Sequence, residues 1–279
     1  MGSRAWSRLL ALLPAGVLVL GCTATPIRAD GTAMGRAGAG FDAIVSTAPY
    51  SLLRQHGWLA PCDVVRPPPG TDAASAYLAH GAGRPGVLFA PSIERCDAAV
   101  ATLRARGVRA ASVTANTPAR ARRAAFAAFD AGTIDVLASP MALSEGFDAP
   151  RAAVCVLDRT CVHHGVYLQT AGRILRPHPT KDPAAGGTPA MLIDLHGASE
   201  RHGHPLADRT YHLEGEPIRL AGPVPRTQRR PHAPHATATR PAATRPAQLR
   251  TAAHRTGQVV GTYIAAAREW FGVLWGWAP

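Results

Sequence analysis

Short apolar runs alternate with helix-like patterns through the middle of the chain, from Val87 to Asp194. The runs predict strands over residues 87–89, 108–113, 134–138, 154–157 and 191–193. The patterns between them predict helices over residues 93–106, 118–129 and 167–175. Ser92 is the predicted N-cap of the first helix, and Thr117-Pro118 the N-cap and first residue of the second. This alternation indicates an α/β fold, a parallel sheet with helices on both faces and functional residues at the carboxyl ends of its strands.

The N-terminal apolar run admits two interpretations. In the first, a short helix over residues 6–13 and a break at Pro14-Ala15-Gly16 precede a buried strand over Val17–Leu20. In the second, Arg4, Arg8 and the apolar run before Gly21-Cys22 form a lipoprotein signal with Cys22 as the lipidated residue. Pro14 favours the helix and strand, so the exported lipoprotein is kept as an alternative.

The composition changes after Leu220. Residues 221–255 contain seven arginines, three histidines and no acidic residue, which predicts a disordered basic tail. Such a tail could bind nucleic-acid phosphates or be a solvated linker. Residues 256–279 place their apolar side chains on one stripe of a predicted amphipathic helix. That helix could dock on a partner, a membrane surface or its own domain, but it is too interrupted to span a membrane.

The charged residues and cysteines exclude several classes of protein. The chain has 30 Lys and Arg against 18 Asp and Glu, a formal charge of +12 that suits a polyanionic partner. Its only lysine, Lys181, lies between Thr180 and Asp182, so the sequence contains no Gly-Lys-Ser/Thr phosphate-binding loop. The five cysteines form no Cys-x-x-Cys pair, which argues against a zinc ribbon or a disulfide framework and favours a reducing, cytoplasmic location.

Three stretches carry specific patterns: Gly-Cys-Thr-Ala-Thr-Pro from residue 21, Ser-Glu-Gly-Phe-Asp from residue 144, and Gln-Thr-Ala-Gly-Arg-Ile-Leu-Arg-Pro from residue 169. With these stretches the chain resembles superfamily 2 DEAD/DEAH-box helicases of the DNA-repair and restriction type. The stretches resemble helicase motifs III, V and VI, and residues 87–91 lie where motif IV is found. The likeness extends from about residue 9 to residue 215 and includes the His- and Arg-rich segment around His196, Arg201, His202 and His204.

The resemblance implies a domain organisation. Residues 1–66 would be the remnant of a first RecA-like domain, with motif III, and a linker. Residues 67–220 would be the second RecA-like domain, followed by the basic tail and the amphipathic helix. The phosphate-binding loop and the Asp-Glu pair of a complete helicase belong to the first domain, and neither pattern occurs in this sequence.

Site residues also follow from the resemblance. Arg173 and Arg176 would reach ATP held by the other RecA-like domain, with Gln169 placing the phosphates or the attacking water. Being three residues apart, they should share one helical face. The remaining residues implied are Gly146, Asp148 and Gly172 near the nucleotide, Thr23 and Thr25 for coupling, and Ser92 and Ser139 for nucleic-acid phosphates.

The expected function is the C-terminal part of an ATP-dependent DNA helicase or translocase. It would act on DNA or RNA, and it would use ATP and Mg²⁺ only together with a separate N-terminal half. Alone it should not hydrolyse ATP, it should hold no metal of its own, and no stable membrane insertion is expected. The alternative is a non-catalytic nucleic-acid-binding module whose main contact is the basic tail.

Overall fold

The computed structural model describes the central part of the chain and short pieces before and after it. The described residues are 8, 12–14, 16–23, 25–26, 34–35, 40–45, 48–140, 148–213 and 219–221. They belong to the first of two units into which the chain divides, residues 1–228 and 229–279. The predicted amphipathic helix, Gly146 and nearly all of the predicted basic tail lie outside the described residues.

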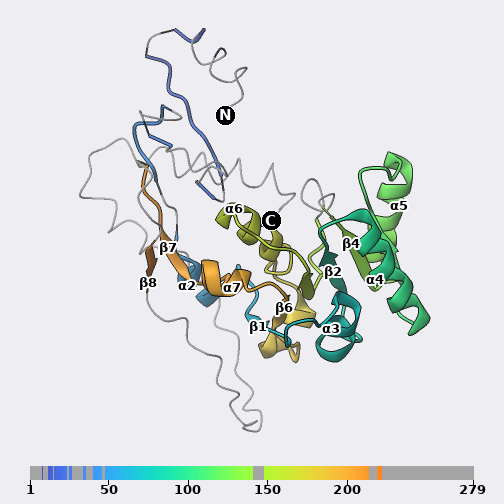
Figure 1. Ribbon diagram of the computed structural model, residues 1–279. Coiled ribbons are helices and arrows are strands. Elements are labelled where there is room, and N and C mark those ends of the chain that lie inside the picture. Colours follow the sequence, from blue (N-terminus) through green and yellow to red (C-terminus); the bar gives the residue numbers. More distant parts are fainter. Residues whose placement is uncertain are drawn as a thin grey trace. The chain divides into compact units, whose positions relative to one another are not determined.

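Six parallel strands form one sheet, in the order β1-β6-β5-β2-β4-β3 (Figure 1). The strands are β1 (Cys62–Val65), β2 (Gly86–Phe89), β3 (Ala110–Ser112), β4 (Val136–Ser139), β5 (Val154–Leu157) and β6 (Ala190–Asp194). The five predicted strands are therefore confirmed, with shifts of a few residues at their ends. β1 is an addition that pairs with β6, so the sheet begins at Cys62, ahead of the boundary expected after residue 66.

Helices and a small hairpin complete the unit. The helices are α2 (Tyr50–Gln55), α3 (Ala73–His80), α4 (Ile93–Ala105), α5 (Ala119–Asp130), α6 (His164–Gly172) and α7 (Ala198–His202). Two short 3₁₀ turns, η1 (Pro179–Lys181) and η2 (Pro183–Ala185), precede β6. The strands β7 (Asp208–Thr210) and β8 (Arg219–Ala221) pair antiparallel.

The first residues of α4 and α5 show which of the two predicted N-caps is present. Ser92 caps α4 as predicted, since its hydroxyl accepts the N–H of Arg95. Thr117 does not cap α5. Its hydroxyl accepts the N–H of Thr114 in the preceding turn, so the N-cap is Pro118 and the helix begins at Ala119.

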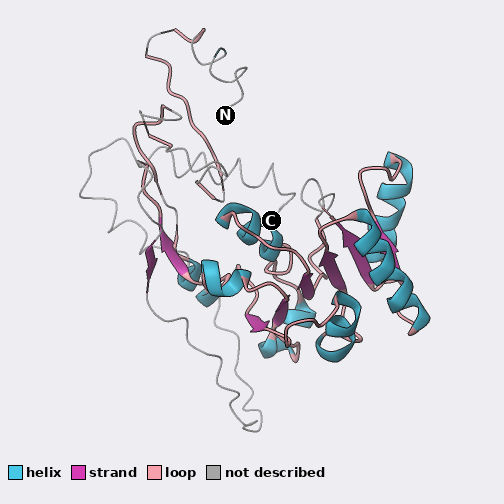
Figure 2. Ribbon diagram, in the orientation of Figure 1, coloured by secondary structure: helices cyan, strands magenta, loops and turns pink. Residues whose placement is uncertain are grey.

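Helices cover both faces of the sheet, as predicted (Figure 2). Alternate residues of β2 show the two layers: Val87 and Phe89 join the core formed with α5 and α6, whereas Leu88 joins the core formed with α3 and α4. All four residues of β2, β4 and β5 are buried. A strand buried on both faces is mostly apolar, which is why the continuous apolar runs in the sequence predicted this sheet.

The N-terminal segment differs from the prediction. Val17 donates its N–H to the carbonyl of Pro14, and Gly16 has a positive φ, so the predicted break is present. The predicted buried strand is wrong, because residues 17–20 form no strand and their side chains are 41–77% exposed. The apolar pattern marks a segment suited to burial, yet the described residues contain no sheet edge that pairs with it.

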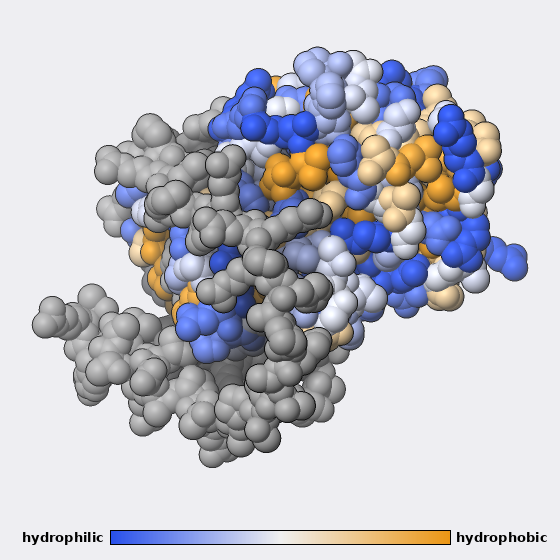
Figure 3. Space-filling view, turned by 90° about the horizontal axis from the view of Figure 1, so that it is seen from below, coloured by the Kyte–Doolittle hydropathy of each residue, from blue (hydrophilic) through white to orange (hydrophobic). Residues whose placement is uncertain are grey.

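One face of the described unit combines polar and apolar areas. Figure 3 shows hydrophilic residues around smaller hydrophobic areas on the described part of the face seen from below. In the part of the chain that the structure describes, every helix is too short or too polar to cross a membrane.

Candidate functional site

The two motif VI arginines lie beyond the end of a helix rather than on it. α6 ends at Gly172, three residues before the predicted end, and Arg173 is its C-cap. The N–H groups of Arg173, Ile174 and Leu175 each donate to a carbonyl three residues earlier, so the chain continues as tight turns. The expectation of one shared helical face is therefore wrong.

These arginines also lie at the unexpected edge of the sheet. The carbonyl of Leu175 accepts the N–H of Ala60, which is two residues before β1 begins. α6 starts after the carboxyl end of β5 and runs back along the sheet, so its C-terminal end reaches the amino edge. The expectation that functional residues gather at the carboxyl ends does not hold for Arg173 and Arg176.

The tertiary structure brings Arg176 to Asp148, the acid of the motif V stretch. Arg176 Nη1 contacts Asp148 Oδ1 in an ion pair whose carboxylate side chain is 56% exposed. Arg173 is half-buried beside this pair. Burial lowers the pKa of its guanidinium, Arg176 lowers it further, and Asp148 opposes the shift. Two guanidinium groups thus lie near the partly exposed carboxylate of Asp148 at the end of α6.

Lys181, the only lysine, supports this end of α6 from inside. Its side chain is fully buried, and Nζ donates to the carbonyls of Ala152 and Ile174 at 2.9 and 3.0 Å. Burial first, and then the charge of Arg176, lowers the pKa of Lys181 to about 7. Lys181 therefore ties the turn after α6 to the residues before β5, and it is not exposed to a ligand.

Motifs III and VI also meet. Gln169, exposed on α6, donates from Nε2 to the hydroxyl of Thr25 at 3.4 Å, and Thr25 is 7% exposed. The Thr23 hydroxyl accepts the N–H of Thr25 and donates to its carbonyl, which closes a local turn. A Cβ added at Gly172 would meet no atom within 4 Å, so open space adjoins the end of the helix.

The two serines proposed for phosphate contact lie at the opposite, carboxyl edge. Ser92 is accessible but engaged as the cap of α4. Ser139 ends β4 and is completely buried, so its hydroxyl is not exposed to solvent. The structure therefore does not bring these serines together with Arg173 and Arg176.

A polar cluster at that carboxyl edge was missed from the sequence. Asp158, which follows β5, is 4% exposed and accepts from Arg95 Nη2 at 3.2 Å. Its other oxygen lies 2.9 Å from Nε2 of His196, which follows β6. The position of Asp158 directly after a predicted buried strand was a signal that could have found it, but its partners are far away in sequence.

The His- and Arg-rich segment after motif VI has a structural role. His202 and His204 bond the carbonyls of Cys161 and Cys62 through Nε2, and Arg209 donates to four carbonyls between residues 202 and 207. The buried carboxylate of Asp194 accepts three N–H groups and the Ser199 hydroxyl at the start of α7. Across the described ranges, no three His, Cys, Asp or Glu side chains are grouped to hold a metal ion.

The central region of the chain is similar to a known protein domain. Residues 71–178 match the model of the helicase conserved C-terminal domain. Over 141 residues the chain is 30% identical to the "51.5 kDa protein" of a Lactococcus phage (isolate 7-9). That alignment covers 50% of this chain and 29% of the phage protein.

A solved structure shares the fold. A fragment assigned as an HsdR subunit of a type I restriction enzyme from Vibrio vulnificus YJ016 matches with a TM-score of 0.52 and 20% identity. The match covers 70% of this chain and 42% of that chain. The E. coli DEAD-box protein SrmB matches with a TM-score of 0.41 and 14% identity, over 53% of this chain and 84% of that chain. The chain thus spans less than half the length of the phage protein and less than half the length of the Vibrio fragment.

Proposed function

We propose that the region matching the helicase conserved C-terminal domain belongs to a superfamily 2 helicase and supplies the arginine half of an ATP site. A second RecA-like domain, with a phosphate-binding loop and the acids that hold Mg²⁺, would complete the site. The assembled pair would be an ATP-driven translocase on DNA or RNA, and the unpaired state of all five cysteines fits a reducing, cytoplasmic location.

The observation that carries this proposal is the pair of arginines gathered at the end of α6. Hydrolysis of bound ATP builds negative charge on the γ-phosphate, and a planar guanidinium stabilises that charge through two parallel N–H donors. Arg173 and Arg176 combine such donors with open space at Gly172. Asp148 would hold Arg176 in position until the phosphates arrive.

The other motif residues fit the same arrangement. Gln169 lies on α6 ahead of the arginines and is linked to Thr25, so a movement of the motif III segment would reach the nucleotide side through this contact. Lys181 is buried and donates to two backbone carbonyls, and the sequence contains no other lysine. The phosphate cradle must therefore come from a different domain, and we expect this chain alone to show no steady ATP hydrolysis.

The test is complementation by a RecA-like domain that carries a phosphate-binding loop, sought first in all three forward frames of the DNA upstream of Met1. Mixing that domain with the full chain should produce nucleic-acid-stimulated ATP turnover. Arg173→Ala should abolish it, because the γ-phosphate loses its guanidinium. Arg106→Gln is the matched control, since Arg106 is an exposed arginine at the C-cap of α4. Turnover by the pure chain that Arg173→Ala removes would overturn the proposal.

A non-catalytic nucleic-acid-binding module is the second candidate, and the exposed side chain of Arg95 at the carboxyl edge favours it. It predicts salt-sensitive nucleic-acid binding that depends on the basic tail and survives substitution of both motif VI arginines. Complementation distinguishes the two candidates, because a pure binding module would add no ATP turnover to the second domain.

A further inference from the structure

Lys181 holds two backbone segments that meet at the motif VI arginines. Its Nζ donates to the carbonyl of Ala152 at 2.9 Å and to that of Ile174 at 3.0 Å. Ala152 follows Asp148 in the motif V segment, and Ile174 lies between the two arginines. The same two segments contribute Asp148 and Arg176, which form an ion pair. One buried side chain therefore joins, from inside, the segments that this pair joins nearer the surface.

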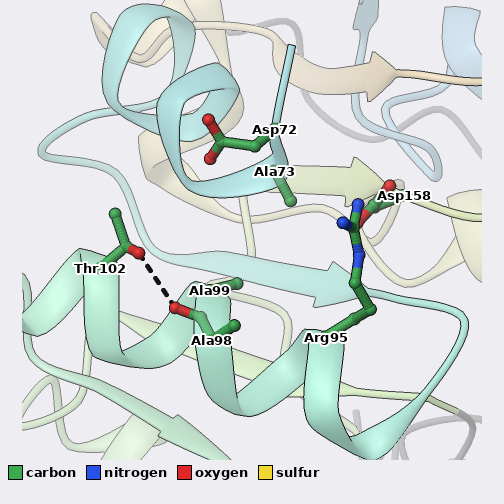
Figure 4. A pocket seen from close by; sticks show the side chains of 7 residues that line it. All are labelled: Asp72, Ala73, Arg95, Ala98, Ala99, Thr102 and Asp158. Carbon is green, nitrogen blue, oxygen red and sulfur yellow. Dashed lines mark hydrogen bonds and ion pairs between the residues drawn. The ribbon is translucent and has the colours of Figure 1, made fainter. Parts of the chain in front are cut away.

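Lys181 acts on the backbone rather than on a ligand. At the other edge of the sheet, Arg95 extends toward Asp158 across the end of a groove of about 150 Å³ (Figure 4). The side chain of Lys181 is fully buried instead, and its Nζ donates to main-chain carbonyls. A change at Lys181 therefore reaches a bound ligand only through the two segments that it holds.

A closed loop presents Lys181 to these carbonyls. Lys181 lies in η1, the first of the two 3₁₀ turns before β6. The N–H of Gly187 donates to the carbonyl of Asp182 at 2.8 Å, and the N–H of Thr188 donates to that of Thr180 at 2.9 Å. A Cβ added at Gly187 would lie 2.5 Å from the backbone of Thr180, so the loop packs tightly against itself. The lysine side chain thus extends from backbone that is itself fixed.

This position suits lysine better than arginine. Of the 30 Lys and Arg residues in the chain, Lys181 is the single lysine. A guanidinium has five N–H donors, so two carbonyls that each accept one bond would leave its other donors buried without partners, which is costly. A neutral amine has two N–H groups, and both have a partner here. Burial, followed by the charge of Arg176, lowers the pKa of Lys181 to about 7, which favours this neutral form.

We propose that Lys181 is a positioning residue of the arginine half of the ATP site. It fixes the position of the motif V segment relative to the turn after α6, so that Arg173 and Arg176 extend from a fixed backbone. Misplacing a reacting group by about 1 Å can cost about 10²-fold in rate. The link to ATP rests on the proposed function, whereas the fixed position of the two segments rests on the bonds of Nζ.

A double-mutant cycle on the ion pair of Asp148 and Arg176 tests this role in the full chain without ATP. Urea denaturation of the original chain, Asp148→Asn, Arg176→Gln and the double variant gives the coupling as a factor in the unfolding equilibrium constant. We expect a factor of about two- to fivefold in the original chain. The same cycle in Lys181→Met should give a factor of about one, because the two segments lose their common support.

The exposed ion pair of Arg109 and Asp135, which joins the residues before β3 and β4, is the matched control. A merely structural role of Lys181 would lower the stability of every variant and leave both couplings unchanged. The proposal predicts that only the coupling of Asp148 to Arg176 is lost. An equal loss in the control pair, an unchanged coupling in Lys181→Met, or no coupling in the original chain would overturn it. Lys181→Gln, which keeps an amide donor, replaces Lys181→Met if thermal unfolding shows that Lys181→Met does not fold.

Complementation connects the position of the two segments to the chemistry. In the complemented pair, Lys181→Met should lower kcat about tenfold or more with little change in KM for ATP, because Lys181 does not contact the nucleotide. Arg122→Met is the control, since Arg122 also donates to two backbone carbonyls but lies on α5. An unchanged kcat in Lys181→Met would overturn the positioning role. If the unsubstituted pair shows no turnover, the proposed function fails, and the double-mutant cycle still decides whether Lys181 fixes the two segments.

Discussion

The two edges of the sheet each contain a buried ionisable side chain, and the two side chains have different roles. At the amino edge, Lys181 is fully buried and donates only to backbone carbonyls, while Arg173 and Arg176 stay closer to the surface. At the carboxyl edge, the buried charge is the carboxylate of Asp158, and it binds exposed side chains directly. Lys181 thus fixes the backbone, and Asp158 fixes the side chains of Arg95 and His196.

This difference indicates two kinds of phosphate contact. A backbone fixed by Lys181 sets the position of the turn after α6 but leaves the arginine side chains able to adjust to a nucleotide on another domain. Arg95 and His196, in contrast, are positioned by Asp158 within this domain alone. We therefore expect the amino edge to act only in an assembled complex, and the carboxyl edge to bind nucleic acid without a partner.

The largest effect should come from Arg173→Lys in the complemented pair. Lysine keeps the charge but lacks the planar fork of donors, so ATP turnover should fall by about 10³-fold or more. The measurement is steady-state phosphate release with nucleic acid present. Turnover within a fewfold of that of the unsubstituted chain would show that only net charge matters at the amino edge.

A pH experiment tests the buried lysine. The folded state lowers the pKa of Lys181 from 10.5 to about 7, so between these values the unfolded chain binds more protons than the folded one. The free energy of unfolding should therefore rise with pH, by up to about 1.4 kcal/mol per pH unit, and stop changing below the folded pKa. Urea denaturation from pH 7 to 9 would detect this slope.

Lys181→Met provides the comparison for that experiment. The variant keeps every other titrating group, so the difference between its stability curve and the original one isolates Lys181. The difference should grow with pH in favour of the original chain. Parallel stability curves would mean that Lys181 stays charged when it is buried.

The smallest expected effect concerns the contact between Gln169 and Thr25. The bond is 3.4 Å long and Gln169 is exposed, so a double-mutant cycle with Gln169→Ala and Thr25→Val should give a coupling of about 0.5 kcal/mol. Urea denaturation of the four proteins measures it. A coupling indistinguishable from zero would separate the motif III segment from the arginine end and confine that site to α6 and Asp148.

The strands show which features of the fold can be predicted from the sequence. The continuous apolar runs at residues 87–89 and 154–157 predicted strands buried on both faces, because helix-covered parallel strands are mostly apolar. Val17–Leu20 has the same pattern but is exposed. Apolarity reports that a segment can be buried, whereas the partner that buries it is a property of the tertiary structure.

The sequence by itself determined the fold class, the central strands and helices, the cap at Ser92 and the absence of a Gly-Lys-Ser/Thr step, because these depend on local spacing and residue type. Only the tertiary structure decided that Arg176 meets Asp148, that Lys181 is buried beneath the turn after α6, and that Asp158 joins Arg95 to His196. Each of these contacts joins separate segments of the chain, and local pattern carries no information about which distant side chains share a carboxylate or a carbonyl.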